Sequence, residues 1–192
     1  MQEDARWLIR MVENLLSVTR IDGGKVNLTK IPTVLEELVD AVLVKFHKRC
    51  PNVPVQVSIP EEFVSIPMDA MLIQQVLTNI LENAVDHAQG MKTLQLQVTV
   101  EQDVAVFAVR DDGCGIQADK MSQLFTGYLD RQSVPVDGTR GNMGIGLSVC
   151  AAINTAHGGE ILARNLQPHG AEFLFTLKMG ESNYESLSDP SC

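Results

Sequence analysis

The sequence lacks any apolar run that approaches the roughly 20 residues needed to cross a bilayer. Its first residues are charged and follow a helical pattern, so we expect no secretory signal peptide there. The cysteines, at 50, 114, 150 and 192, form no Cys-x-x-Cys pair and have no histidine at metal-ligand spacing. This spacing argues against a disulfide framework or a zinc site. These absences together predict a cytoplasmic protein with reduced thiols.

An excess of positive charge is also lacking, because 24 acidic residues outweigh 15 Lys and Arg to give a formal net charge of −9. Proteins that bind nucleic acid broadly usually present a basic face, so this balance predicts no nucleic-acid partner. It does not exclude a single nucleotide, whose phosphates a metal ion and a few local groups can balance. Apolar residues at 45% and charged residues at 20% are typical of a soluble globular domain with a substantial core.

Hydrophobic periodicity predicts helices over residues 4–21, 32–48, 69–88 and 144–156, and strands over 25–28, 55–58, 64–66, 94–100, 105–110, 161–164 and 171–177. Pro32 is expected to open the second helix and Asp69 to cap the third. Residues 117–142 suggest a mobile loop. The mixed order of elements predicts a two-layer α/β sandwich, with a mixed, mainly antiparallel sheet and helices packed on one face.

Asn79 and Asn83 are one turn apart in the third predicted helix, so their side chains point the same way. Magnesium takes hard oxygen ligands and keeps several waters, so an amide oxygen and phosphate oxygens can complete its shell. Taken alone, the pair is more typical of a helix that turns two polar residues to solvent. Beside Gln75, Glu82 and two further motifs, it indicates part of a metal and phosphate site.

The second motif, Asp-Asp-Gly-Cys-Gly, begins at Asp111, directly after a predicted strand. Its glycines, Gly113 and Gly115, let the backbone turn and approach a flat ligand closely. A carboxylate at the floor of a pocket can accept a hydrogen bond from the adenine amine, where guanine would present a carbonyl. An Asp-Gly turn after a strand is common, so the motif predicts a base site only in combination with the asparagine helix. Cys114 is expected to be a small packing residue.

The third motif, Gly-Asn-Met-Gly-Ile-Gly-Leu, covers residues 141–147 and leads into the fourth predicted helix. Unhindered backbone N–H groups and the positive end of a helix dipole favour an anionic phosphate. A glycine-rich loop that merely tightens onto a helix is the alternative for any single Gly-x-Gly. Taken together, the three motifs provide for a metal ion, a purine base and a polyphosphate, which is an ATP pocket.

In combination and order, the three motifs resemble the Bergerat (GHKL) ATP-binding fold, and within it the catalytic domain of two-component sensor histidine kinases. The similarity runs from about residue 7 to residue 177. It implies that Asp111 binds adenine, and that Asn83 holds magnesium while Asn79 lies near the phosphates, both with catalytic roles. It implies that His87 contacts the phosphates or the ribose. The other ATP-binding residues that it implies are Gly113, Gly115, Gly141, Gly144, Ile145, Gly146 and Leu147.

The chain departs from the pattern of that family at Asp86 and Asn142, and more mildly at Asp112, which takes the place of a common Asn. Asp86 stands where Lys or Arg is usual, and its carboxylate would repel phosphates unless it turns away. Asn142 replaces the first glycine of the phosphate loop. Asn79 occupies the place of the glutamate general base of gyrase-type and Hsp90-type ATPases. Because an amide cannot take a proton from water, hydrolysis is expected to be slow, as suits a kinase.

None of the histidines, at 47, 87, 157 and 169, lies in a His-Glu-Leu-Arg-like helix. The resemblance therefore implies a fragment of a larger sensor kinase, with the phospho-accepting histidine on a hairpin elsewhere in the full-length protein. We expect residues 1–22 to be the end of the dimerisation-hairpin helix, residues 23–179 the ATP-binding catalytic domain, and residues 180–192 a disordered polar tail. Residues 15–28 and 81–85 resemble the potassium-responsive (Kdp-type) sensor kinases.

The implied cofactors are ATP and magnesium. The implied partners are the histidine hairpin, a response regulator whose aspartate receives the phosphoryl group, and a second copy of the full-length protein. The protein would be cytoplasmic or the cytoplasmic part of a membrane-bound sensor. Two other functions stay open: a degenerate nucleotide-binding signalling module without kinase activity, and a different Bergerat-fold ATPase or serine kinase of the anti-sigma type.

Overall fold

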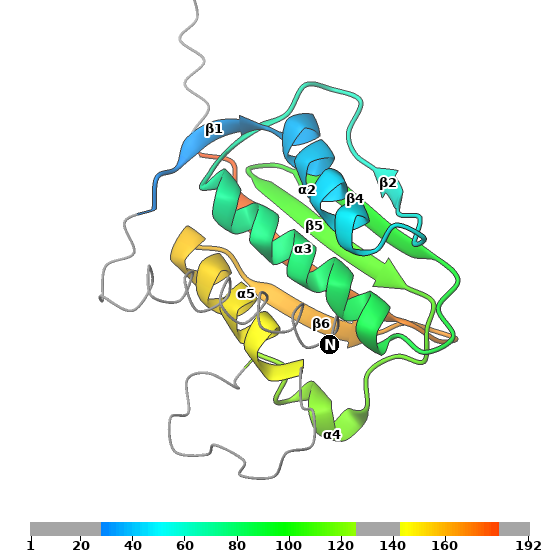
Figure 1. Ribbon diagram of the computed structural model, residues 1–192. Coiled ribbons are helices and arrows are strands. Elements are labelled where there is room, and N and C mark those ends of the chain that lie inside the picture. The colour runs from blue at the N-terminus through cyan, green and yellow to red at the C-terminus, as the bar shows by residue number, and fades with distance from the viewer. Residues whose placement is uncertain (1–27, 126–142, 181–192) are drawn as a thin grey trace, which may run out of the picture.

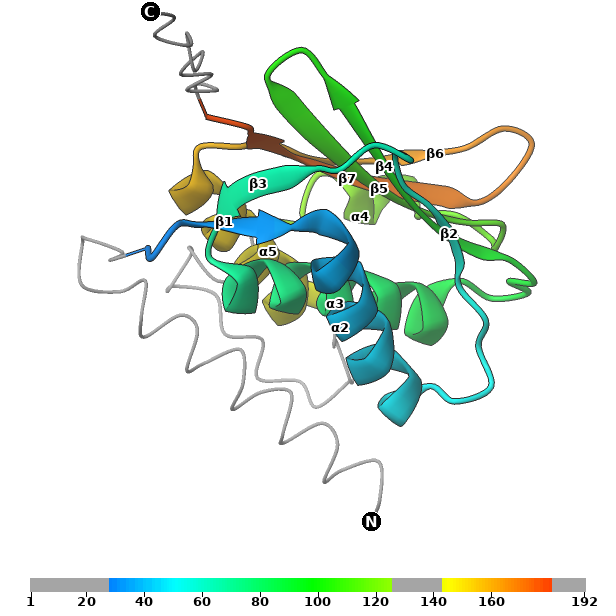
Figure 2. The same cartoon turned by 90° about the horizontal axis from the view of Figure 1, so that it is seen from above.

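The computed structural model describes residues 28–125 and 143–180, with the side chains of residues 143–145 left out. Its main layer is a five-stranded sheet with the strand order β2-β4-β5-β7-β6. The helices α2 (Leu35–Arg49), α3 (Ala70–His87) and α5 (Met143–His157) lie along one face of this sheet (Figure 2). This arrangement confirms the predicted two-layer α/β sandwich. In the described part of the chain, no helix combines the length and the apolar character needed to cross a membrane.

The sheet is mixed and mainly antiparallel, as predicted. β2 (Gln56–Ser58) pairs in parallel with β4 (Leu94–Glu101), whereas β5 (Val104–Asp111) and β7 (Ala171–Lys178) each pair antiparallel with their neighbours. β6 (Ile161–Asn165) closes the opposite edge against β7. Every second side chain of a strand points to the helices, and there Phe107 and Phe175 stack with ring centroids 4.7 Å apart.

The central helix is α3, which lies between α2 and α5 in Figure 1. It begins where the sequence predicts, because the Asp69 carboxylate accepts a hydrogen bond from the Leu72 N–H at 3.3 Å and caps the first turn. Ile73, Leu77 and Ile80 are fully buried. The half-buried Asn79 and Asn83 therefore project from a helix whose position is held by the core.

The end of α5 is joined to the start of α3 through the buried imidazole of His157. The Asp69 backbone N–H donates to Nε2 at 3.1 Å, so the ring carries its proton on Nδ1, which donates to the Ile153 carbonyl at 2.8 Å. Burial lowers the pKa of His157 and favours this neutral form. Lys30 adds a hydrogen bond to the His157 carbonyl at 3.0 Å.

The prediction that Pro32 opens a helix is wrong. Pro32 lies in β1 (Ile31–Val34), which pairs antiparallel with β3 (Ser65–Met68), so that Pro32 faces Pro67 in a separate two-stranded sheet. Helix α2 begins only at Leu35. A proline lacks the N–H that a central strand needs, but it is tolerated in a short edge pairing such as this one.

Several expectations fall outside the described residues. They are the first predicted helix, all but the last residue of the strand predicted over residues 25–28, most of the loop at 117–142, and the tail. The described beginning of that loop contains the short helix α4 (Ala118–Met121). The remaining predicted helices and strands are present, with ends shifted by at most three residues.

Candidate functional site

Helix α3 contacts the segments that carry the other two motifs. The Asn79 Nδ2 lies 3.5 Å from the Gly146 carbonyl oxygen in the first turns of α5, a long hydrogen bond. At the other end of the motif, a Cβ on Gly113 would lie only 2.6 Å from the Cβ of Ala88, the residue that caps α3. Asn83 lies in sequence between these two contacts. The fold therefore brings together three motifs that are far apart in the chain.

Asp111 is the last residue of β5, and it is only 6% exposed. Its Oδ1 accepts a hydrogen bond from the Gly113 N–H at 2.9 Å. Burial raises the pKa of the Asp111 carboxyl, and the hydrogen bonds from Gly113 and Ala171 oppose this effect only in part. A buried carboxylate with an incompletely balanced charge is well suited to accept a further hydrogen bond from a ligand.

The glycines after Asp111 allow close packing within the protein itself. Gly113 approaches Ala88, as described above. Gly115 has a φ of +76°, and a Cβ there would lie 2.9 Å from the Asn165 Oδ1. From the sequence we inferred that these glycines let the backbone approach a ligand. The structure shows a different reason for these glycines, which is that the loop packs closely between α3 and the end of β6.

Asp112 was not a candidate residue, yet it holds the same loop to the start of β4. Its carboxylate accepts hydrogen bonds from the backbone N–H groups of Lys92 at 2.7 Å and Thr93 at 2.8 Å. These bonds lower the pKa of Asp112 to about 2, and the bond from Thr93 has the larger effect. The Asp112 side chain therefore serves the loop as a structural anchor.

The prediction that Cys114 is a small packing residue is wrong, because the side chain is exposed. Its sulfur lies 3.8 Å from the carbonyl oxygen of the half-buried His87. The buried thiol is instead Cys150, which donates to the Val76 carbonyl at 3.8 Å. Burial raises the pKa of Cys150 to about 12.

Asp86, the carboxylate expected to disfavour phosphates, is exposed, so water screens its charge.

The phosphate-loop candidates are described only in part. Gly141 lies outside the described residues, and Gly144 and Ile145 belong to the first turn of α5. The Gly146 carbonyl accepts the hydrogen bond from Asn79, and the Leu147 side chain is buried in the core. Placing an anion at the start of α5 therefore rests on the helix dipole and on backbone N–H groups.

A magnesium ion would find few protein ligands here. In residues 28–125 and 143–180, no group of three or more His, Cys, Asp or Glu side chains could hold a metal ion. The half-buried Asn83 offers one neutral oxygen. This donor set fits magnesium only if phosphate and water supply most of its ligands, which is usual for a metal that arrives with a nucleotide.

Residues 68–181 match the family described as histidine kinase-, DNA gyrase B-, and HSP90-like ATPase. This match covers more than half of the chain, so the protein belongs to that family, whose nucleotide is ATP.

Among individual proteins, the chain is similar to the sensor protein KdpD of Clostridium acetobutylicum. The two are 37% identical over 175 residues, which make up 91% of this chain and 19% of KdpD. The chain thus spans about a fifth of the length of that relative. The predicted similarity to Kdp-type sensor kinases is confirmed.

Solved structures of histidine kinases share the fold. AdeS of Acinetobacter baumannii superposes with a TM-score of 0.72 at 21% identity, covering 93% of this chain and 82% of AdeS. ThkA in complex with the response regulator TrrA gives a TM-score of 0.69 at 21% identity, covering 91% of this chain and 49% of the other. At these identities the likeness confirms the predicted fold class.

Proposed function

We propose that this chain binds Mg-ATP and donates the γ-phosphoryl group to a histidine outside this chain, for relay to a response-regulator aspartate. The observation that carries the proposal is the buried Asp111 carboxylate. It lies at the end of β5, in a loop that packs against the end of the asparagine helix. Membership of the ATPase family and similarity to a sensor kinase support it.

Each motif then has a role. The Asp111 oxygen that is not bound to Gly113 accepts a hydrogen bond from the adenine amine, and the start of α5 attracts the phosphates through its dipole. Asn83 offers its amide oxygen to magnesium, which would neutralise charge on the transferring phosphoryl group. Because the accepting nucleophile is the histidine outside this chain, catalysis by the domain rests on binding and orienting ATP.

Asn79 favours phosphoryl transfer over hydrolysis. It stands where related ATPases have a glutamate base, and in this structure its amide nitrogen lies against the Gly146 carbonyl. An amide cannot take a proton from water, so steady-state ATP hydrolysis should be slow. Phosphate release that is rapid and lost in Asn83→Ala would favour the ATPase alternative instead.

The proposed protein partners follow from the relatives. We expect the phospho-accepting hairpin of the same full-length protein and a response regulator to dock on this domain, and the full-length protein to form a homodimer. ThkA, which shares the fold, is found in complex with the response regulator TrrA. Supplying the hairpin, radiolabelled ATP and the chain should give acid-labile phosphohistidine, whereas acid-stable phosphoserine would favour the anti-sigma type.

The first test is a titration with a non-hydrolysable ATP analogue and the matching GTP analogue, with and without magnesium. The wild type should bind the ATP analogue more tightly, whereas Asp111→Asn should lose most of this binding. The new amide oxygen would stay with the Gly113 N–H and turn an NH₂ group towards the adenine amine. The control is Asp103→Asn, the same change at an exposed position in the turn between β4 and β5, and this variant should bind the ATP analogue normally.

Absence of binding by a folded wild-type chain would replace the kinase proposal with the degenerate signalling module. Equal binding by Asp111→Asn and the wild type would show that Asp111 does not read the base.

A further inference from the structure

The loop after Asp111 is contacted by α3 at Gly113 and also by the turn that joins β6 to β7. At Gly170, where φ is +105°, a Cβ would overlap the Asp111 carbonyl oxygen, so the two backbones are in direct contact. One residue earlier, the His169 Nδ1 donates to the Asp112 carbonyl at 2.8 Å. The turn is itself closed by a hydrogen bond from the Leu166 N–H to the Gly170 carbonyl at 2.9 Å. The β6–β7 turn therefore has a defined conformation and can support the loop after Asp111.

Asn165, at the end of β6, makes the most specific contact of this support. Its Oδ1 accepts from the Ile116 N–H at 2.7 Å, and its Nδ2 donates to the Ile116 carbonyl at 2.9 Å. The carboxamide thus pairs with both polar backbone groups of a residue 49 positions away, as a neighbouring strand would. The missing side chain at Gly115 leaves space for it, since a Cβ there would lie 2.9 Å from the Asn165 Oδ1.

We propose that Asn165 is a positioning residue for the nucleotide base. The loop from Asp111 to Ile116 is held by β5 at its first residue and by Asn165 at its last. Gly113, whose N–H orients the Asp111 carboxylate, lies between these two points. Fixing Ile116 therefore fixes the direction of the carboxylate that faces adenine. The inference rests on the proposed function, because it assigns a role within the same nucleotide site.

The test compares Asn165→Ala and Asn165→Asp with the wild type in the titration with the ATP and GTP analogues. In Asn165→Ala, loss of two hydrogen bonds should raise the Kd for the ATP analogue about tenfold. The difference between the Kd values for the ATP and GTP analogues should become smaller. Asn165→Asp has the same shape and can still accept from the Ile116 N–H. However, it sets a carboxylate oxygen against the Ile116 carbonyl, so it should bind as weakly as Asn165→Ala. A side chain that merely filled space would tolerate this change.

Arg164→Ala is the matched control, because Arg164 is the preceding residue and points to the other face of the sheet, where it contacts Glu172. This variant should lower the thermal midpoint slightly and leave both Kd values unchanged. Hydrogen exchange without nucleotide gives an independent measurement, in which the Ile116 amide should exchange faster in Asn165→Ala but not in Arg164→Ala. If Asn165→Ala is unfolded, Asn165→Asp carries the test, because it has the shape of the wild-type side chain and retains the hydrogen bond from the Ile116 N–H.

The outcomes separate the two proposals. If the wild type binds the ATP analogue and the folded Asn165 variants bind it equally well, the positioning role is overturned and the proposed function stands. If the folded wild type does not bind, the proposed function is overturned, and the role of Asn165 in nucleotide binding with it.

Discussion

Two glycines of this domain are required for different physical reasons, and the free energy of unfolding of single-residue variants can tell these reasons apart. Gly158 and Gly170 both have positive φ, at +78° and +105°. A Cβ on Gly158 would meet no atom within 4 Å, whereas one on Gly170 would overlap the Asp111 carbonyl. The first position needs glycine for its backbone conformation alone, and the second also needs it for backbone contact.

Gly158→Ala should therefore cost about 1 kcal/mol of unfolding free energy, the usual strain of a left-handed alanine. Gly170→Ala should cost about 3 kcal/mol, because overpacking against the backbone adds to that strain. Urea denaturation of both variants measures the two values. Equal losses would mean that the turn moves away from Asp111 without cost.

Between elements, a single imidazole joins α5 to the start of α3. Burial lowers the pKa of His157 below its ordinary 6.5, because the charged ring would lose its hydration. Protonation would also place a second donor, on Nε2, against the Asp69 N–H. Two charges also act on this pKa: Lys30 lowers it and Asp69 raises it. Between the lowered folded pKa and 6.5 the unfolded chain binds more protons than the folded chain. Stability from this contact is thus complete above pH 6.5 and is lost as the pH falls.

The wild type should therefore lose stability as the pH is lowered from about 7 towards the folded pKa of His157. His157→Gln removes this titration, and its unfolding free energy should be flatter over the same range. The difference between the two denaturation series isolates the histidine from the carboxylates that titrate at lower pH. Parallel curves would mean that the ring is as easily protonated in the folded chain as in the unfolded one.

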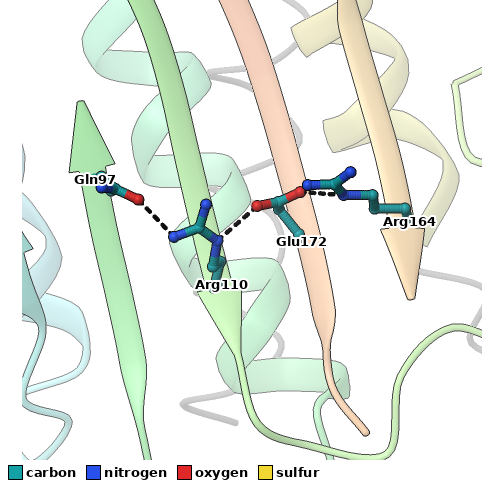
Figure 3. A network of polar contacts seen from close by, with 4 residues as sticks. All are labelled: Gln97, Arg110, Arg164 and Glu172. Atoms are coloured by element: carbon teal, nitrogen blue, oxygen red, sulfur yellow. Dashed lines mark hydrogen bonds and ion pairs between the residues drawn. The ribbon is translucent and has the colours of Figure 1, made fainter. Parts of the chain in front are cut away.

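On the open face of the sheet, four strands are linked by a row of polar side chains (Figure 3). Glu172 of β7, whose side chain is 1% exposed, is bound by Arg110 of β5 at 2.5 Å and by Arg164 of β6. Arg110 also donates to the Gln97 side chain of β4 at 2.5 Å. Burial alone would raise the pKa of Glu172, but the hydrogen bonds from Arg164 and Arg110 lower it.

Arg110→Ala should destabilise the domain by about 2 kcal/mol, because it removes two contacts and leaves a buried carboxylate with one cation. Arg164→Ala should cost under about 1 kcal/mol, since that side chain is 64% exposed and its ion pair is screened. Thermal denaturation of the two variants at low and high salt measures the loss of stability in each. A larger loss for Arg164→Ala would contradict the ranking by exposure.

At the scale of the whole molecule, nucleotide binding should be visible as stabilisation. Mg-ATP at about one hundred times its Kd adds about 2.7 kcal/mol to a chain that binds it only when folded. For a domain of this size, the melting temperature should rise by about 5–10 °C. Asp111→Asn should show almost no rise and Asp103→Asn the full rise. An equal rise in all three would indicate that the nucleotide binds elsewhere.

Local sequence patterns alone were enough to predict most elements of this fold. The periodicity of α3, its cap at Asp69 and the alternation in β4 and β5 involve neighbours in the chain, so the residues themselves carry the information. The three motifs likewise predicted the family, because each has its characteristic residues within a short stretch. Pro32 was misassigned because a proline suits a first helical turn and an edge strand equally well, and its partner Pro67 lies 35 positions away.

Only the tertiary structure decided how the candidate site is supported. The roles of Asn165 at Ile116, of Asp112 at Lys92 and Thr93, and of Gly113 at Ala88 depend on contacts between distant segments. Such contacts leave no periodic trace, because a single side chain meets a single backbone group. The sequence by itself thus determined the family to which the chain belongs and the elements on which its motifs lie. The tertiary structure decided which other residues hold those motifs in place.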